Sequence, residues 1–201
     1  MNTIIRKSVL AIAGLTFAGG VVAGPATTAL AAPHTTAPTA AAAQAAAVVQ
    51  ADKPGKDKLI PHGTQGAQSR IELSDEQKTN AKAIIAATKK AGLDERAAVI
   101  SIATALQESK LKNLGHLGER NDHDSQGLFQ QRPSSGWGTV EQITDPEYAS
   151  TAFLNGLKQV DGWRDMPLTK AAQKVQVSAY PFAYAQWETQ AADIVADNWN
   201  S

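Results

Sequence analysis

The sequence predicts a compact, mainly α-helical domain of about five helices, preceded by an N-terminal region that does not fold. Residues from Ser74 onward contain several helix-capping residues, each followed by apolar residues at helical spacing. One of these segments, Ala97 to Leu106, contains no charged residue, so its helix should be buried on most faces. By contrast, residues 32–58 are rich in Ala, Thr and Pro and offer little to bury.

The first 31 residues have the organisation of a cleavable signal peptide. Arg6 and Lys7 form a short positive region, an apolar stretch interrupted by glycines follows, and Ala29 to Ala31 supplies small residues for cleavage. The glycines argue against a membrane anchor, because a spanning helix needs about 20 unbroken apolar residues. We therefore expect a secreted protein, extracellular or associated with the cell wall, with no stable membrane insertion after cleavage.

Length and composition set further limits. A chain of 201 residues is long enough for one domain with appendages, since a domain takes about 150 residues. We expect a disordered linker and lead-in over residues 32–70 and the folded domain over residues 71–201. The absence of cysteine excludes thiol catalysis and thiolate metal sites. Lys plus Arg equals Asp plus Glu, at 19 each, so no basic field predicts binding to nucleic acid.

The helices of the domain follow from their start and stop signals. Ser74 and Gln77 form a capping box, which opens a helix that ends near Gly92. Asp94 caps a second helix, which should run to about Lys110. A long polar loop follows and leads into a short strand or turn at residues 127–131. Three further helices are expected over residues 144–160, 169–179 and 182–198.

Glu108 is the first candidate for chemistry. It follows the uncharged run of the second helix and lies on the same helical face as Ser101 and Thr104. A carboxyl group at the end of a buried helix is partly desolvated, which raises its pKa toward the range that a general acid needs. The alternative is that Glu108 points to solvent and pairs with Lys112, four residues further on.

Two motifs carry a resemblance to a known family. They are Gln107-Glu108-Ser109 at the end of the second helix and Gly127-Leu128-Phe129-Gln130 after the loop. Together they resemble the lytic transglycosylases and goose-type lysozymes of the lysozyme-like superfamily, over about residues 74–199. The resemblance implies a compact lysozyme-like helical domain in which the loop forms a cleft.

The resemblance also implies a substrate and roles. The substrate would be a peptidoglycan glycan strand, cut at the β-1,4 bond between N-acetylmuramic acid and N-acetylglucosamine. Glu108 would protonate the bond oxygen, and Ser109 would orient Glu108 or the substrate. The cleft wall, which binds acetamido groups, would consist of Gly127, Leu128, Phe129 and Gln130. This assignment is physically sensible, because glycine allows close approach of the backbone and an amide both donates and accepts.

The sequence departs from the family pattern at one place. Lytic transglycosylases commonly carry Ala-Tyr-Asn in a later helix, and the best counterpart is Ala179-Tyr180-Pro181. We expect Tyr180 to contribute to substrate binding near Glu108. Because Pro181 stands in place of Asn, the choice between a transglycosylase and a hydrolase stays open.

A second carboxylate would activate water or stabilise the sugar cation. The loop offers Glu119, Asp122 and Asp124, and Asp124 is the preferred candidate because it precedes the Gly-Leu-Phe-Gln motif. If none of them serves, Glu108 acts alone, first as acid and then as base toward the C6 hydroxyl of the muramic acid. Trp137, between two glycines, is the best candidate for stacking against a sugar.

Other chemistries find less support. His116 and His123 lack the spacing of a zinc peptidase motif, and the acidic residues lack that of a calcium loop, so we expect neither a metal nor a cofactor. The leading hypothesis is therefore a monomeric peptidoglycan glycosidase. Its alternative is a non-catalytic wall-binding module with a lysozyme-like fold. A wall peptidase would need a cysteine or a zinc motif.

Overall fold

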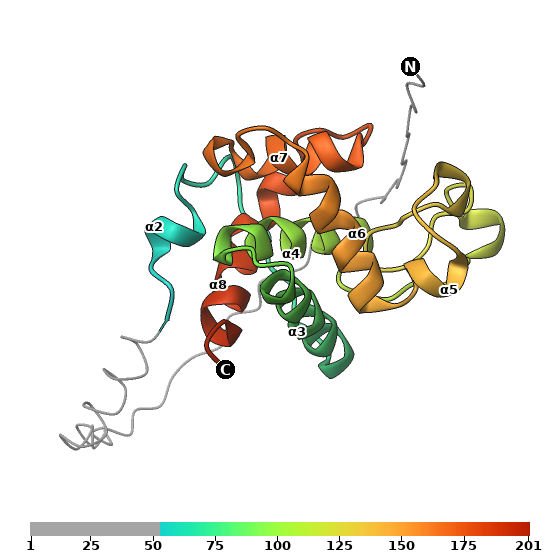
Figure 1. Ribbon diagram of the computed structural model, residues 1–201, viewed down its shortest axis with the longest axis horizontal. Helices are drawn as coiled ribbons and strands as arrows, with labels where there is room; N and C mark the ends of the chain where they lie inside the picture. Colours follow the sequence, from blue (N-terminus) through green and yellow to red (C-terminus); the bar gives the residue numbers. More distant parts are fainter. Residues whose placement is uncertain (1–52) are drawn as a thin grey trace, which may run out of the picture. The chain divides into compact units, whose positions relative to one another are not determined.

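The computed structural model describes residues 53–201, and all of the named elements within this range are helices (Figure 1). The predicted signal peptide and residues 32–52 of the predicted linker lie outside the described residues. The α-helices of the described part are α2 (Lys56–Leu59), α3 (Asp75–Lys90), α4 (Glu95–Ser109), α5 (Val140–Ile143), α6 (Pro146–Lys158), α7 (Leu168–Gln176) and α8 (Glu188–Asn198). Short 3-10 helices connect several of them, and one, Ala183–Trp187, directly precedes α8.

The five predicted helices are confirmed as α3, α4, α6, α7 and α8. The Ser74 hydroxyl accepts from the backbone N–H of Gln77, and the Gln77 side chain accepts from the backbone of Ser74, so the capping box forms. The carboxylate of Asp94 caps α4 through the N–H of Ala97. The last helix begins later than expected, at Glu188, because the preceding turn is wound as a 3-10 helix. The four-residue helices α2 and α5 were not predicted.

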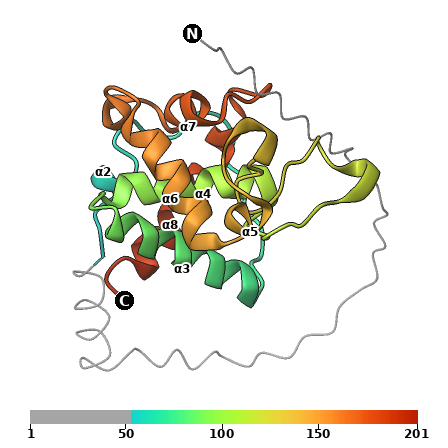
Figure 2. The ribbon, with the colours of Figure 1, turned by 45° about the vertical axis from the view of Figure 1, so that its right-hand side comes forward.

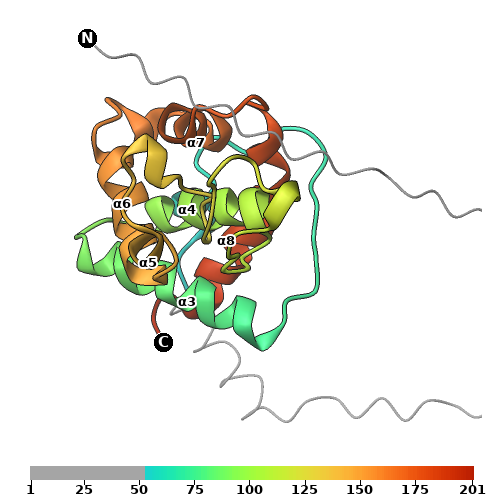
Figure 3. The same ribbon diagram turned by 90° about the vertical axis from the view of Figure 1, so that its right-hand side faces the viewer.

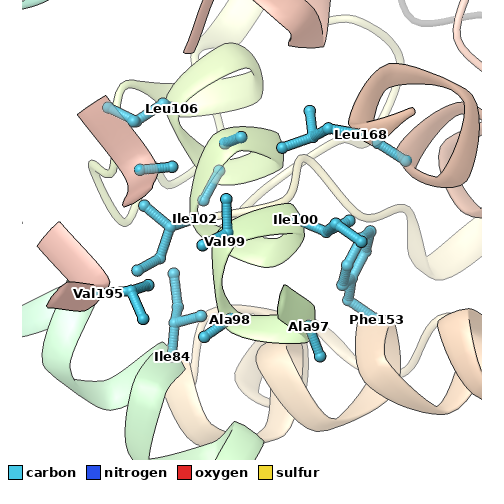
Figure 4. Close-up of a cluster of buried hydrophobic side chains, with 14 of the residues drawn as sticks. Ile84, Ala97, Ala98, Val99, Ile100, Ile102, Leu106, Phe153, Leu168 and Val195 are labelled. Carbon is cyan, nitrogen blue, oxygen red and sulfur yellow. The ribbon is translucent and has the colours of Figure 1, made fainter. Parts of the chain in front are cut away.

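Helix α4 is the centre of the fold. Its residues 97–106 are all buried, as the uncharged sequence predicted. Figures 1 and 3 show α4 in the middle, with α7 on one side and α3 and α8 on the other. Figure 4 shows its apolar side chains clustered with one residue from each of α3, α6, α7 and α8, which are Ile84, Phe153, Leu168 and Val195. Near the C-terminal end of α4, Gln107 and Glu108 are only partly buried.

The segment between α4 and α5 contains the predicted loop, which Figure 2 shows reaching away from the helices. The expected strand or turn at residues 127–131 is a turn. It is closed by two backbone hydrogen bonds between Gln126 and Gln131, of 2.9 and 3.0 Å, which form an isolated antiparallel bridge. Within residues 53–201 no longer β-pairing occurs. The turn carries the motif Gly127 to Gln130 to the end of α4.

The lead-in is more ordered than predicted. Residues 53–70 were expected to belong to the linker, but Leu59 and Ile60 are buried in the core. Further along, the backbone N–H of Ser69 donates to the carbonyl of Gln186 at 2.7 Å. The folded unit therefore includes Lys53 and the residues that follow it, rather than beginning at residue 71. Two apolar residues in a charged stretch give no periodicity from which this packing could be predicted.

A buried ion pair joins the lead-in to the core. Nη1 of Arg96 donates to a carboxylate oxygen of Glu188 at 2.7 Å and to the backbone oxygen of Leu59 at 2.8 Å. Both charged side chains are almost fully buried, with 5% and 2% of their surface exposed. The pair thus connects α4, α8 and the end of α2. No helix of residues 53–201 has the length and apolar composition needed to cross a membrane.

Candidate active site

Glu108 lies in the last turn of α4 and is bound by side chains from two distant segments. The phenol of Tyr184, in the 3-10 helix before α8, donates to Oε1 of Glu108 at 2.7 Å. The amide of Gln176, the last residue of α7, donates to the same oxygen at 3.2 Å. Glu108 therefore points toward Tyr184 and Gln176 rather than pairing with Lys112. Glu108 as a whole residue is partly exposed.

The surroundings favour the protonated form of Glu108. Burial of the carboxyl group raises its pKa, and the hydrogen bonds from Tyr184 and Gln176 and the charge of Lys110 counteract this only in part. The negative charge of Asp122 raises the pKa further. Burial also raises the pKa of Tyr184, so its phenol stays a proton-bearing donor. The result is a carboxylic acid that holds its proton to higher pH than an exposed glutamate does.

The turn after α4 keeps Glu108 in place. Lys110 and Leu111 both have left-handed backbone conformations, with φ of 58° and 60°. Their carbonyl oxygens accept from two buried side chains of α3, Gln77 at 2.6 Å and Asn80 at 2.9 Å. Helix α4 is therefore forced to end directly after Ser109. The ammonium of Lys110 lies 4.6 Å from the ring centre of Trp187, and its charge acts on Glu108.

The motif Gly127 to Gln130 packs beside Glu108 and is bonded to Ser109 and Gln176. The Ser109 hydroxyl lies 2.8 Å from the carbonyl oxygen of Leu128, and Gln176 donates to the carbonyl of Phe129 at 2.9 Å. The side chains of Leu128 and Phe129 are fully buried, and Phe129 stacks on Phe153 with ring centres 4.9 Å apart. These residues were expected to form the cleft wall. Their carbonyl groups are instead bonded to the residues around Glu108.

Gly127 has a structural reason to be glycine. Its φ is +76°, and a Cβ atom there would lie 2.0 Å from the carbonyl oxygen of Ile143. The close approach that we expected for a sugar is thus occupied by the chain itself. Gln130, also with a positive φ of 48°, donates from its side-chain amide to the Gly127 carbonyl at 3.1 Å and stays partly exposed. Of the four motif residues, Gln130 is therefore the one whose side chain reaches the surface.

A substitution at Gly127 tests this packing. Gly127→Ala is expected to destabilise the domain by roughly 2–5 kcal/mol, the sum of left-handed strain and a backbone collision. Gly118→Ala is the matched control, because φ is +64° there and nothing lies within 4 Å of the added Cβ, so only the strain of roughly 1–2 kcal/mol applies. Urea unfolding of both variants measures the difference. Equal losses of stability would contradict the proposed collision with Ile143.

Asp124 is engaged within the loop. Its carboxylate accepts from the Arg132 guanidinium at 3.0 Å and from the backbone and hydroxyl of Ser134 at 2.7 Å each. Partial burial acts to raise its pKa, but these hydrogen bonds outweigh it and lower the pKa to about 2. Asp124 is therefore ionised at neutral pH, and its hydrogen bonds shape the loop. Among the loop carboxylates it is Asp122 whose charge acts on Glu108, although its Oδ1 also lies 2.7 Å from Nδ1 of His123.

The tyrosine beside the acid is Tyr184 rather than Tyr180. Tyr180, expected near Glu108, is 48% exposed, and its backbone N–H donates to the Ser178 hydroxyl. The sequence predicts a packing role in the core for Tyr184, because it lies on the same helical stripe as Trp187. One signal could have identified it, since Ala183-Tyr184 repeats the Ala-Tyr pair of Ala179-Tyr180 four residues later. Gln176 had no comparable signal.

Trp137 contacts the core and lines a surface cavity of about 540 Å³ between its loop, α6 and α7. The loop histidines bond locally, since Nδ1 of His116 accepts from the Gly118 N–H at 3.0 Å. In residues 53–201 no group of three or more His, Asp or Glu side chains is placed to hold a metal ion. Comparison with models of known protein families and with curated protein sequences finds no match.

Proposed function

We propose that this domain is a secreted glycosidase that cuts peptidoglycan glycan strands, with Glu108 as general acid. The observation that carries the proposal is the environment of Glu108, a partly exposed residue whose carboxyl group is held in its protonated form by burial and oriented by Tyr184 and Gln176. The substrate class, a β-1,4 linkage between N-acetylmuramic acid and N-acetylglucosamine, comes from the motif resemblance. The alternative is a wall-binding module without activity.

The chemistry begins with Glu108. Its proton moves to the glycosidic oxygen while the bond from that oxygen to C1 of the muramic acid breaks, which leaves an oxocarbenium-like sugar and an ionised Glu108. The phenol of Tyr184, the amide of Gln176 and the ammonium of Lys110 then stabilise the new carboxylate, because each favours the charged form. A carboxyl group that is buried and also surrounded by donors can release a proton as the acid and take one up again as the carboxylate.

Two second steps are compatible with this site. In a transglycosylase, Glu108 takes the proton of the muramic C6 hydroxyl as that oxygen bonds to C1 and closes an anhydro ring. In a hydrolase, water attacks C1 with help from a second carboxylate. Because the charge of Asp122 acts on Glu108, whereas Asp124 is bonded to Arg132 and Ser134, we infer that Asp122 is the better candidate for that role.

Digestion of purified peptidoglycan in ¹⁸O-labelled water tests the activity and separates the two steps. A transglycosylase releases anhydro ends, which are one water lighter and free of ¹⁸O, whereas a hydrolase releases reducing ends that carry ¹⁸O. Mass spectrometry of the released muropeptides distinguishes them. Co-sedimentation of the folded protein with peptidoglycan, without new ends of either kind between pH 4 and 8, would favour the binding module.

The charge of Lys110 should be visible in the pH dependence. Lys110→Met removes a positive charge that lowers the pKa of Glu108, so this pKa is expected to rise further. Because the general acid must be protonated, the alkaline limb of the activity profile then moves to higher pH. Lys110→Arg, which keeps the charge, is the control and should keep the limb in place. If the alkaline limb of Lys110→Met lies at the same pH as in the wild type, or at a lower pH, this role of Lys110 is contradicted.

A further inference from the structure

The cavity beside Trp137 is a second candidate site. It lies between the loop at Gly136 and Trp137, helix α6 and the C-terminal end of α7. Its volume of about 540 Å³ is in the range that small ligands occupy in proteins, roughly 300–1,000 Å³. The lining residues are Gly136, Trp137, Tyr148, Ala152, Gly156, Lys174, Val175 and Val177.

Two glycines allow the segments around this cavity to pack closely. A Cβ at Gly156 would lie 2.8 Å from Cγ1 of Val175, so α6 and α7 touch closely at this point. A Cβ at Gly138 would lie 2.9 Å from the ring of Tyr148, which packs the loop against α6. The cavity thus lies between closely packed segments, and its lining includes aromatic side chains and valines.

The charge of the lining indicates the class of ligand. Lys174 is exposed at the cavity and forms no ion pair with another described residue, and the lining contains no carboxylate. Two other cavities of the domain differ in this respect, because each is lined by both acidic and basic side chains. The cavity at Trp137 is thus suited to a ligand with an apolar part and a carboxylate.

Helix α7 and the residue after it connect the cavity to Glu108. Gln176, which donates to Glu108 and to the Phe129 carbonyl, stands between Val175 and Val177, which both line the cavity. While the peptides of a glycan strand are attached, the lactyl carboxyl group of each muramic acid is tied up in an amide bond, so the free carboxylates of the strand belong to the short peptides. A peptide next to the bond being cut is therefore the part of such a substrate that matches the lining.

We infer that this cavity binds the stem peptide of the glycan strand, with a carboxylate on Lys174 and apolar side chains against Trp137, Val175 and Val177. The inference rests on the proposed function. It makes the domain selective for strands that still carry peptides. Because a charge-assisted hydrogen bond contributes about 1.5 kcal/mol, its loss corresponds to about a tenfold change in affinity.

The test compares glycan strands with stem peptides and the same strands after enzymatic removal of the peptides, which leaves the free lactyl carboxylate of each muramic acid but removes the peptide's carboxylate and apolar side chains. The wild type is expected to show a KM about tenfold lower for the peptide-bearing strands. Lys174→Ala should lose this preference and keep its kcat/KM on stripped strands, and Lys174→Arg should restore it. Lys170→Ala, an exposed lysine on the same helix, is the matched control and should behave as the wild type. Equal rates on both substrates in the wild type, or a preference that survives Lys174→Ala, would overturn the inference.

A binding measurement keeps the inference separate from the proposed activity. Titration of the wild type with N-acetylmuramyl-L-alanyl-D-isoglutamine is expected to shift the NMR signals of the Trp137 indole and the Val177 amide, and Lys174→Ala should abolish the shifts. If neither strand preparation is cut but these shifts occur, the glycosidase fails and the peptide site stands. If the strands are cut but the wild type shows no shifts, the peptide site is wrong and the glycosidase stands.

Discussion

Glu108→Gln is expected to lower kcat on peptidoglycan by about 100- to 10,000-fold, the contribution usual for a general acid. The amide has nearly the shape of the carboxylic acid, and its oxygen can still accept from Tyr184, but it has no proton to give to the leaving oxygen. Release of soluble muropeptides by the wild type and the variant measures the loss. Circular dichroism and thermal unfolding serve as controls, since the fold should be retained. A folded variant with more than a tenth of wild-type activity would contradict the role of Glu108.

Arg96→Leu is expected to produce the largest loss of stability. It leaves Glu188 buried without its partner, and breaking a buried pair in this way costs about 3–5 kcal/mol. At about 2–4 °C per kcal/mol for a domain of this size, the Tm should fall by roughly 6–20 °C. Differential scanning calorimetry of the wild type and the variant provides the measurement.

The pH dependence of this loss has a defined sign. Burial raises the pKa of Glu188 above its ordinary value of 4.5, and Arg96 counteracts the rise. A raised pKa in the folded state stabilises the fold below pH 4.5, and that stability is lost as the pH rises through the folded pKa. Removing Arg96 raises the pKa further, so Arg96→Leu should cost more at pH 7.5 than at pH 4.5.

The double variant Arg96→Leu with Glu188→Leu distinguishes the loss of the ion pair from the cost of leaving one buried charge without its partner. Replacing both charges by apolar groups should recover most of the stability, because no buried charge then lacks a partner. Nε and Nη2 of Arg96 already lack hydrogen-bond partners in the described part of the chain, which makes the guanidinium itself costly to bury. A double variant as unstable as Arg96→Leu alone would contradict this account of the pair.

The helices could be predicted from sequence because their signals are local. Ser74 with Gln77 and Asp94 each determine a helix start through bonds that span three residues. The uncharged run of α4 predicted a central helix because burial on all faces excludes charge. Helices α2 and α5 were missed because four residues complete about one turn and cannot show a period of 3.6, even though α5 begins at a capping box of Thr139 and Gln142.

The site could be predicted only in part. Glu108 was predicted from its helix and its motif, but its partners are far away in sequence. Gln176 is separated from it by 68 residues and Tyr184 by 76. Such contacts depend on how helices pack, which no local pattern specifies. Asp124 was chosen for its place before the motif, and only the three-dimensional arrangement reveals that Arg132 and Ser134 bind it.

The buried side chains around Glu108 combine two opposite requirements. Burial favours the acid, whereas the donors Tyr184 and Gln176 favour the carboxylate that forms after proton transfer. A carboxyl group in an apolar pocket alone would hold its proton too firmly, and an exposed one would lose it at neutral pH. The two long-range contacts therefore matter as much for the proposed chemistry as Glu108 itself.

The proposed function depends most directly on the protonation state of Glu108. A ¹³C NMR titration of the side-chain carboxyl signals, with that of Glu108 assigned by its absence in Glu108→Gln, measures this state in the folded protein. We predict a titration midpoint for Glu108 above the ordinary value of 4.5. A midpoint at or below 4.5 would mean that Glu108 is ionised like an exposed glutamate, and it would contradict the assignment of Glu108 as general acid.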